Sequence, residues 1–455
     1  MKSREIDMTT GRTFTKILLF AGPLILAGIL QCLYNAADII VIGRFAGEAP
    51  LAAVGATASL INLITNMFIG LSVGTAITVS IAIGARNTER IRRLVHTSIA
   101  IACVAGIAVT AIGFFGARFF LELMKTPDDI LDMATTYLRI YFLGSVPTLL
   151  YNYGAAVIRS AGDSRRPLYY LAVSGIINVF LNLFFVIVCH MTVDGVAIAT
   201  VIAQTVSAAC VIVQLLLRRD ACRLSIAKLR FHGKELLDIL RTGIPAGIQS
   251  VVFSISNTII QAAINGFDTF AVAGNTSGSN IDGFIYTAMY AMHTTAVTAV
   301  GQNVGAGKPE RIRRILFQCL LTVVMIGVIL GGIVLIFMRP LLRIYLPNSP
   351  ESVEFGVIRL TILASTYFLC GIMDTVVGVS RGMGQTLLPM VMSITGVCGI
   401  RLVWIATIFR RFHTLAVLYV SYPVSWAVTA AIQLVACFVI LKRLMKNKGE
   451  TPTLS

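Results

Sequence analysis

The chain is poor in charged residues. Asp, Glu, Lys and Arg make up 13% of its 455 residues, whereas soluble proteins usually carry about 25%. Hydrophobic residues account for 56%, and the mean hydropathy is +0.84. This composition excludes a disordered protein and a coiled coil, and no segment is polar enough to form a separate soluble domain. It is typical of a protein that crosses a membrane many times.

Paired cysteines and short catalytic motifs are also missing. The nine cysteines are never closer than 12 residues and most lie in apolar runs, a pattern that fits neither a CxxC metal site nor a disulfide framework. The sequence has no HExxH motif and no GxxxxGK[ST] loop. It therefore predicts neither a zinc hydrolase of that type nor transport driven by ATP.

Twelve apolar runs are long enough to cross a bilayer, since a span needs about 20 such residues. The runs cover residues 17–42, 51–84, 95–117, 133–158, 168–189, 193–217, 244–266, 271–304, 315–338, 355–380, 387–409 and 414–441. The sequence therefore predicts an all-α membrane protein with twelve transmembrane helices, of which the first is an uncleaved N-terminal helix.

The basic residues predict the orientation of these helices. The net charge is +16 and the pI is about 9.7. Most Lys and Arg fall at 2–16, 86–93, 159–166, 218–241, 308–314, Arg381 and 442–448. With twelve spans, all of these clusters lie on the same side of the membrane. The positive-inside rule therefore predicts a multi-pass protein of the inner (plasma) membrane with both termini in the cytoplasm. This interpretation is favoured over nucleic-acid binding.

The sequence repeats itself. Residues 84–93 and 305–314 are identical at seven of ten positions, at an offset of 221. At an offset of 222, Pro23, Asn35 and Arg159 match Pro245, Asn257 and Arg381. We therefore predict an N-terminal six-helix lobe (1–217), a cytoplasmic linker (218–241) and a C-terminal six-helix lobe (242–455). A pseudo-twofold axis along the membrane normal relates the lobes, an architecture that suits alternating access.

Several of these residues resemble a known family. The run Gln31-Cys32-Leu33-Tyr34-Asn35-Ala36-Ala37-Asp38-Ile39-Ile40-Val41-Ile42-Gly43-Arg44, which follows Pro23, is similar to the first helix of multidrug and toxic compound extrusion (MATE) transporters. Residues 52–56, 84–85 and 381–386 resemble later parts of the same family. The resemblance covers the whole chain in order.

This resemblance implies a secondary transporter and not an enzyme. It implies efflux of small organic cations and other drugs by antiport with H⁺ or Na⁺, without a cofactor, by a monomer in the lipid bilayer. Lipid-linked flippases share the superfamily, so a flippase or exporter of a lipid-linked or other amphipathic substrate is the alternative. We expect an interior with acids and few bases, which argues against a pyrophosphate ligand.

Asp38 is the first candidate for ion coupling, because an acid inside a span costs about 2.5–3.5 kcal/mol. Gln31 and Asn35 precede it at helical spacings and form one polar stripe with it. The carboxylate can take a proton or hold Na⁺; a hydrogen-bonded packing role is left open. The resemblance implies that Asn178, Asn182 and Thr200 join Asp38, with Na⁺ placed at Asp38 and Asn178. Ordinary interhelical hydrogen bonding is the alternative for the two Asn residues.

Asp374 is the second acid expected inside a span. Its repeat partner is Asn152, and that of Asp38 is Ile260, so the halves keep acids at non-equivalent places. The resemblance implies an ion-binding acid in a sodium-coupled branch. The Glu that accompanies it there is missing, and Phe253 is one of the residues found instead. We therefore expect Asp374 to bind either the ion or the positive charge of the substrate; a structural role is left open.

Other polar and aromatic residues are candidates to line the substrate cavity. They are Gln31, Tyr34, Asn35, Asn152, Asn257, Met289 and His293. Histidine relays protons near neutral pH, although a structural role with nearby hydroxyl groups is the alternative for His293. For Arg401, in the eleventh run, snorkelling or pairing is expected. Pro23 is the expected bending point of the first helix.

Overall fold

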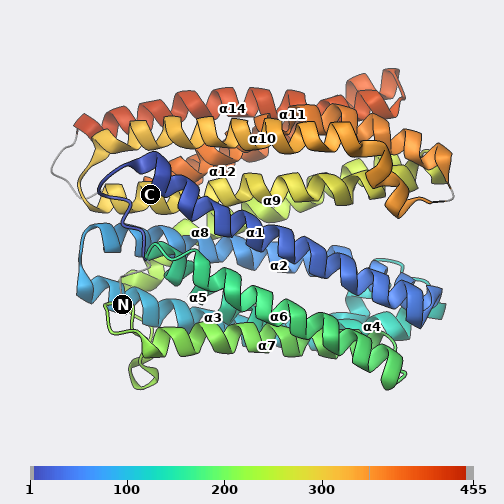
Figure 1. Ribbon diagram of the computed structural model, residues 1–455, viewed down its shortest axis with the longest axis horizontal. Coiled ribbons are helices and arrows are strands. Elements are labelled where there is room, and N and C mark those ends of the chain that lie inside the picture. Colours follow the sequence, from blue (N-terminus) through green and yellow to red (C-terminus); the bar gives the residue numbers. More distant parts are fainter. Residues whose placement is uncertain (1–4, 348, 447–455) are drawn as a thin grey trace.

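The computed structural model describes residues 5–347 and 349–446, and every regular element within these ranges is a helix (Figure 1). The first half contains α1 (Thr13–Val41), the π-helix η1 (Ile42–Ala46), α2 (Glu48–Gly84), α3 (Thr88–Leu123), α4 (Asp128–Leu143), α5 (Ser145–Ser160), α6 (Arg165–Leu183), the π-helix η2 (Phe184–Val188) and α7 (Val193–Leu217). The second half contains the 3₁₀ turn η3 (Ile226–Lys228), α8 (Gly233–Ile264), α9 (Thr269–Gly305), α10 (Pro309–Tyr345), α11 (Pro350–Gly382), α12 (Leu387–Ser393), the π-helix η4 (Ile394–Gly399), α13 (Ile400–Trp404), the π-helix η5 (Ile405–Phe409) and α14 (Leu415–Lys446).

These helices make twelve membrane crossings. In the part of the chain that the structure describes, ten helices are long and apolar enough to cross a membrane. The other two crossings are α4–α5, which a turn at Gly144 interrupts, and α9, which is rich in Gly, Ser, Thr and Asn. The predicted all-α fold with twelve helices is therefore confirmed.

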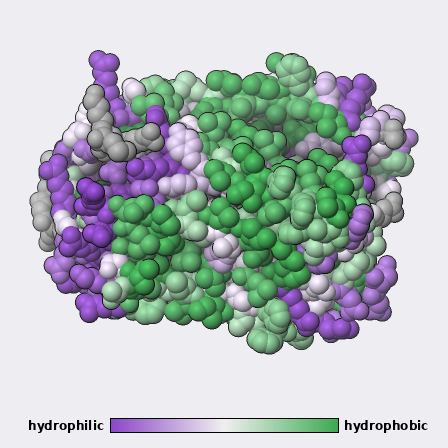
Figure 2. Space-filling view, turned by 60° about the horizontal axis from the view of Figure 1, so that its bottom comes forward, coloured by the Kyte–Doolittle hydropathy of each residue, from purple (hydrophilic) through white to green (hydrophobic). Residues whose placement is uncertain are grey.

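The two ends of the bundle differ in charge. The beginning of α1 and the end of α14 lie at one end, together with the loops before α3, α6, α8, α10 and α12 (Figure 1). We call it the basic end, because most of the predicted Lys and Arg clusters fall in or next to these segments; those at 2–16 and 442–448 reach outside the described residues. Arg381, which the hydropathy pattern places after the tenth run, lies instead in the last turn of α11 and is buried. Figure 2 shows hydrophilic residues at both ends and a hydrophobic surface between them, as expected for a protein surrounded by lipid.

The polar connection between the halves is shorter than the predicted linker of 218–241. Because α8 begins at Gly233, only residues 218–232 join α7 to α8. This loop is held against the bundle, since the Ser225 N–H donates to His96 Nε2 at 3.1 Å. The lobe boundaries at residues 217 and 242 remain a prediction.

Glycine allows α2 and α8 to pack in backbone contact. A Cβ atom at Gly70 would lie 2.7 Å from the carbonyl oxygen of Ala246, and one at Gly74 would lie 2.4 Å from that of Ile239. Small residues spaced by four are a common way to bring membrane helices together. Ser72, between the two glycines, is 4% exposed. This G-x-S-x-G sequence therefore serves helix packing and is not a strand-to-helix nucleophile elbow.

The repeated motif closes the basic end. Its first residues, Gly84 and Gly305, lie where α2 and α9 cross. A Cβ atom at Gly84 would lie 1.9 Å from the carbonyl oxygen of Gln302, and one at Gly305 would lie 1.9 Å from that of Ile81. Neither position accepts a side chain without moving a backbone, so both copies of the motif need glycine here.

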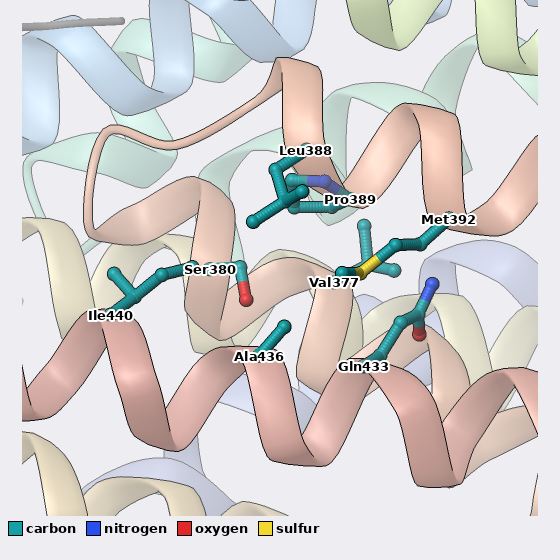
Figure 3. Close-up of a pocket in the computed structure, with 8 residues that line it drawn as sticks. All are labelled: Val377, Ser380, Leu388, Pro389, Met392, Gln433, Ala436 and Ile440. Atoms are coloured by element: carbon teal, nitrogen blue, oxygen red, sulfur yellow. The ribbon is translucent and has the colours of Figure 1, made fainter.

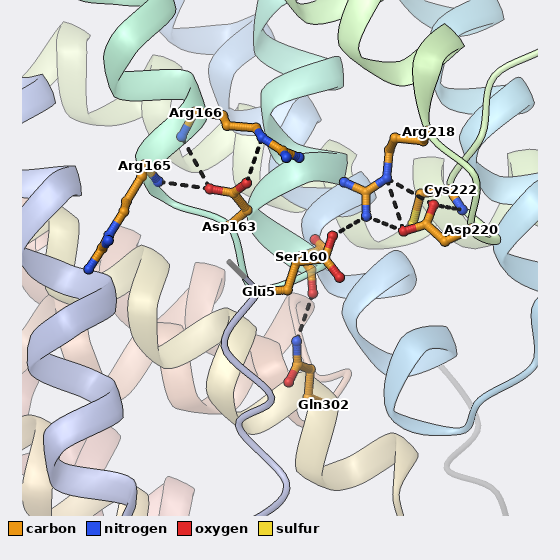
Figure 4. A network of polar contacts seen from close by, with 9 residues as sticks. All are labelled: Glu5, Ser160, Asp163, Arg165, Arg166, Arg218, Asp220, Cys222 and Gln302. Carbon is orange, nitrogen blue, oxygen red and sulfur yellow. Dashed lines mark hydrogen bonds and ion pairs between the residues drawn. The ribbon is translucent and has the colours of Figure 1, made fainter. Parts of the chain in front are cut away.

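Residues 5–12, which we call the N-terminal strap, bind both halves at the basic end. The Ile6 N–H donates to the Gly162 carbonyl at 3.0 Å, and the Met8 N–H donates to Gln302 Oε1 at 2.9 Å. The Gln302 amide also donates to the Ser160 carbonyl at 2.8 Å (Figure 4). Met8 itself is fully buried. The strap therefore ties the α5–α6 loop to the end of α9.

Arg218 fixes the beginning of the strap. Its guanidinium forms ion pairs with Glu5 and Asp220, and its Nε lies 2.9 Å from Asp220 Oδ1 (Figure 4). Burial alone would raise the pKa of Asp220, but the hydrogen bond and charge of Arg218 bring that pKa below its usual value. This polar cluster therefore depends on an ionised carboxylate.

We expect Gly84→Ala and Gly305→Ala to separate α2 and α9 at the basic end, because overpacking costs about 1–3 kcal/mol. Each should lower the melting temperature and speed hydrogen exchange in the strap. Gly332→Ala in α10 is the control, since a Cβ there meets no atom within 4 Å. Exchange as slow as in the parent for both variants would contradict this role of the crossing.

A second expectation concerns pH. Because the pKa of Asp220 is lowered in the folded state, its stabilising contribution is present above the ordinary value of 3.8 and is lost as the pH falls through the lowered pKa. The melting temperatures of the parent and Asp220→Asn should therefore differ at pH 7 and converge below pH 3.8. A difference that is the same at both pH values would contradict the ionised pair.

Candidate functional site

Asp38 lies in the last turn of α1, at the face that packs against α6. Tyr34, one turn earlier, donates its hydroxyl to the Ala172 carbonyl at 3.2 Å. Gly175 leaves room for the Tyr34 ring, since a Cβ there would lie 1.8 Å from the ring. This close contact brings the Asn182 amide into a hydrogen bond with the Asp38 carboxylate. The predicted Asp38–Asn182 pair therefore exists as a contact between two helices.

Asn178 and Thr200 extend this contact to α7. The Asn182 amide lies 3.4 Å from Asn178 Oδ1, and the Asn178 amide lies 3.4 Å from Thr200 Oγ1. Asn182 is fully buried and Asn178 is 5% exposed. All four residues predicted for ion coupling in the first half thus lie in one cluster, which we call the Asp38 cluster.

The Asp38 cluster has an unused buried acceptor. The Oδ1 atom of Asn182 is buried and has no hydrogen-bond partner among the described residues. A buried acceptor without a donor is uncommon in folded proteins. Carboxylate, amide and hydroxyl oxygens are the ligands that hard cations prefer. The donor set therefore fits a small cation, and Asp38 by itself fits a proton.

Two of the three helices of the Asp38 cluster, α1 and α6, change conformation next to it. α1 continues into η1 after Val41, and α6 continues into η2 after Leu183. π-Helical turns often occur at functional sites, because they leave the regular backbone hydrogen-bond ladder. The cluster is thus built where α1 and α6 are least regular.

The residues predicted for the substrate cavity are dispersed. Gln31 and Asn35 are exposed and bonded to each other at 3.2 Å, not to Asp38. Asn152 donates to its own helix and lines a small pocket of about 20 Å³ with Tyr141 and other residues of the first half. Met289 is fully buried against α11, a packing position. No described contact joins these residues into one surface.

Another pocket lies between α11, α12 and α14 (Figure 3). It leaves no room for a water-sized molecule. Its lining residues are Val377, Ser380, Leu388, Pro389, Met392, Gln433, Ala436 and Ile440. None of them is a predicted site residue, and their side chains are mainly apolar, so this pocket is separate from both acids.

Asp374 and His293 lie together between α9 and α11. His293 Nδ1 is 2.8 Å from the Asp374 carbonyl oxygen, and Nε2 is 3.4 Å from Arg381 Nη1. A guanidinium only donates, so Nε2 accepts and Nδ1–H donates to the carbonyl. The ring also stacks on Tyr290 at 5.4 Å. His293 therefore acts as a neutral bridge between helices here, and its proton-relay role remains a prediction.

The side chain of Asp374 is less supported than that of Asp38. It is 8% exposed, and within the described ranges no residue makes a hydrogen bond or ion pair to its carboxylate. Nor does any contact link it to Asp38. The structure thus places the two acids in separate clusters, and the role of Asp374 remains a prediction.

A third acid inside a predicted span was not among those expected. Asp282 lies in the eighth run, on α9, and is 3% exposed. Its carboxylate accepts from Arg359 Nε at 3.0 Å and pairs with Nη2 at 2.8 Å. Asn275 accepts from the same guanidinium at 2.7 Å. The sequence did contain a signal for this ion pair, because one predicted span holds an Asp and another holds an Arg.

The expectation of few bases in the interior is wrong. Arg381 is 5% exposed; it donates to Gln249 Oε1 at 2.8 Å, and its Nε is buried. Its repeat partner Arg159 also has a buried Nε, and neither Nε has a hydrogen-bond partner among the described residues. Arg401 is 5% exposed, so it neither snorkels to water nor pairs with an acid among the described residues. The interior therefore carries positive as well as negative charge.

Comparisons with known proteins agree with this architecture. The sequence model of the MatE family matches residues 23–184 and again residues 245–407. "Probable multidrug resistance protein YpnP" of Bacillus subtilis is 26% identical over 391 residues, 86% of this chain and 87% of that protein. "Probable multidrug resistance protein NorM" of Thermotoga maritima is 25% identical over 391 residues, 85% of this chain and 84% of that protein.

Solved structures show the same fold. One describes the outward-facing conformation of a multidrug resistance MATE family transporter of the MOP superfamily. It superimposes with a TM-score of 0.91 at 20% identity, covering 98% of this chain and all of the other.

The bond between Asn182 and Asp38 is testable by a double-mutant cycle. Asn182→Leu should cost about 1–2 kcal/mol of unfolding free energy in the parent, because it removes a donor from a buried carboxylate. The cost should be smaller in the Asp38→Leu background. Asn152→Leu, whose amide donates only to its own helix, is the control. Additive costs would contradict an energetic link between the two residues.

Proposed function

This chain belongs to the MatE family of multidrug efflux transporters and is a membrane-spanning secondary transporter, not an enzyme; we propose that it exports amphipathic organic cations and other drugs by antiport with H⁺ or Na⁺. The observation that carries the proposal is the Asp38 cluster. One carboxylate and several oxygen donors lie between three helices, where a cation changes the charge of the site.

Coupling requires that the ion and the substrate use the same negative charge. A proton or Na⁺ on Asp38 removes the charge that attracts a cationic drug, so the two exclude each other. A proton or Na⁺ on Asp38 also changes the carboxylate that accepts from the Asn182 amide. It therefore alters the hydrogen bond that holds α1 against α6. Pro23 lies inside α1, where a proline breaks the hydrogen-bond ladder and supplies a bending point.

We propose that the basic end faces the cytoplasm of the inner membrane, with both termini inside. The Lys and Arg clusters in the basic-end loops support this orientation. The Gly84–Gly305 crossing and the strap then close the cytoplasmic side. Drug uptake from the cytoplasm requires that the crossing separates and the strap leaves one half, and release occurs toward the opposite end.

A flippase or exporter of a lipid-linked or other amphipathic substrate is the second candidate. The buried arginines without carboxylate partners favour it, because phosphate groups need such donors.

Gradient-driven transport in proteoliposomes tests the proposal. A fluorescent organic cation should leave vesicles under either a pH gradient or a Na⁺ gradient, and Asp38→Asn should abolish that efflux. Asp129→Asn removes an exposed acid at the other end of the bundle and should transport like the parent. Full activity in Asp38→Asn would contradict the coupling role, and no efflux of the cation by a folded protein would favour the second candidate.

A further inference from the structure

The helices that carry Asp38 have counterparts in the second half. α6 packs against α1 and α7, and the segment from α12 to η5 packs against α8 and α14 in the same way. Asn257 and Tyr422 stand 222 residues after Asn35 and Thr200. The charge differs, however. Ile260 replaces the acid, and Arg401 is the only charged residue between 387 and 409.

Arg401 is held in a defined position. Its Nε donates to Ser425 Oγ at 3.2 Å, and its Nη1 donates to Asn257 Oδ1 at 3.2 Å. The guanidinium carbon lies 4.1 Å from the ring centroid of Tyr422 and 6.0 Å from that of Trp426. Arg401 sits in α13, a short helix between two π-helices, η4 and η5. The group is thus oriented by neutral partners from two other helices, α8 and α14.

What Arg401 lacks is a negative partner. Arg359 is buried to the same degree and also lies over a tyrosine ring, but Asp282 neutralises it. No Asp or Glu of the described chain lies within ion-pair distance of Arg401. A guanidinium in a membrane span is expensive unless an anion accompanies it. Its planar donors also match carboxylate and phosphate oxygens.

Asn257 is the exposed member of this group, whereas Arg401 and Ser425 are buried. We take the side of Asn257 as the approach to the guanidinium, because an oxygen that replaces Asn257 Oδ1 at Nη1 comes from that side. Tyr422 and Trp426, whose rings lie 5.7 Å apart edge to face, form an aromatic wall beside it.

We propose that Arg401, with Asn257 and Ser425, binds an anionic oxygen group of the transported molecule, a carboxylate or a phosphate. Tyr422 and Trp426 pack against the apolar or aromatic body to which this group is attached. The preferred substrates are then organic cations that also carry an acid group, that is zwitterions, over cations without one. This inference deepens the proposed export function, on which it rests for the identity of its ligand as a substrate.

Two rhodamine dyes that differ in one carboxylate test the site. One carries the free benzoic acid and the other its ethyl ester. Binding is measured by fluorescence polarisation on the full chain in a neutral detergent. Arg401→Gln should weaken binding of the acid at least about tenfold, because a charge-assisted hydrogen bond is lost, and should leave the ester within about twofold. An equal loss for both dyes, or no loss for the acid, would overturn the proposal.

A second variant covers the case in which Arg401→Gln does not fold. Asn257→Asp keeps the size of the side chain and supplies an internal carboxylate against Nη1. It should weaken binding of the acid dye and leave binding of the ester dye unchanged. Unchanged binding of the acid would overturn the proposal. The control is Arg410→Gln, which also removes one positive charge but at an exposed position just beyond η5. It should change the binding of neither dye.

Phospholipid competition identifies the source of the anionic group. Displacement of the acid by phosphatidylglycerol but not by phosphatidylcholine, lost in Arg401→Gln, would support the same site with a lipid headgroup as its ligand. Displacement by neither lipid would support a small-molecule acid. Because binding needs no gradient, dye that binds through Arg401 but is not transported would contradict the antiport and not the site.

Discussion

Taking a charged side chain out of water is the constraint around which this interior is arranged. Asp38 receives the amide of Asn182, and Asp282 receives the guanidinium of Arg359. In each pair the partners belong to different helices. The interactions that compensate for lost hydration therefore also decide how neighbouring helices rotate against each other, and a change in the charge of one partner alters that packing.

The duplicated halves share a framework but not its charges. The helix pair α1–α6 carries an acid, and the equivalent helices of the second half carry Arg401. Both halves keep the glycines of the repeated motif, because the backbones that meet there leave no space for a side chain. Side chains that face the interior between helices are free to diverge, so two sites of opposite charge arise in one architecture.

Much of this structure could be predicted from the sequence, because its signals are local. Hydropathy predicted the twelve helices, and the repeat predicted the duplication. The i,i+4 spacing placed Asn178 and Asn182 on one face, and the family resemblance implied that this face meets Asp38. Asp282 was missed because its run, 271–304, already contains many Gly, Ser, Thr and Asn residues. One more polar side chain there changes the hydropathy pattern little. Arg401 was misjudged because its partners, Asn257 and Tyr422, lie on other helices. Which faces of two helices meet depends on packing across the whole bundle.

The crossing at the basic end obeys a symmetry rule. Gly84 approaches Gln302 while Gly305 approaches Ile81, and 221 residues separate both Gly84 from Gly305 and Ile81 from Gln302. Each half thus presents the same patch to the other, which is the definition of an isologous contact. A single six-helix chain bearing this patch is complementary to a second parallel copy of itself. The fold is in this sense a homodimer whose subunits have been fused, and the fusion is what allowed one copy to keep an acid and the other an arginine.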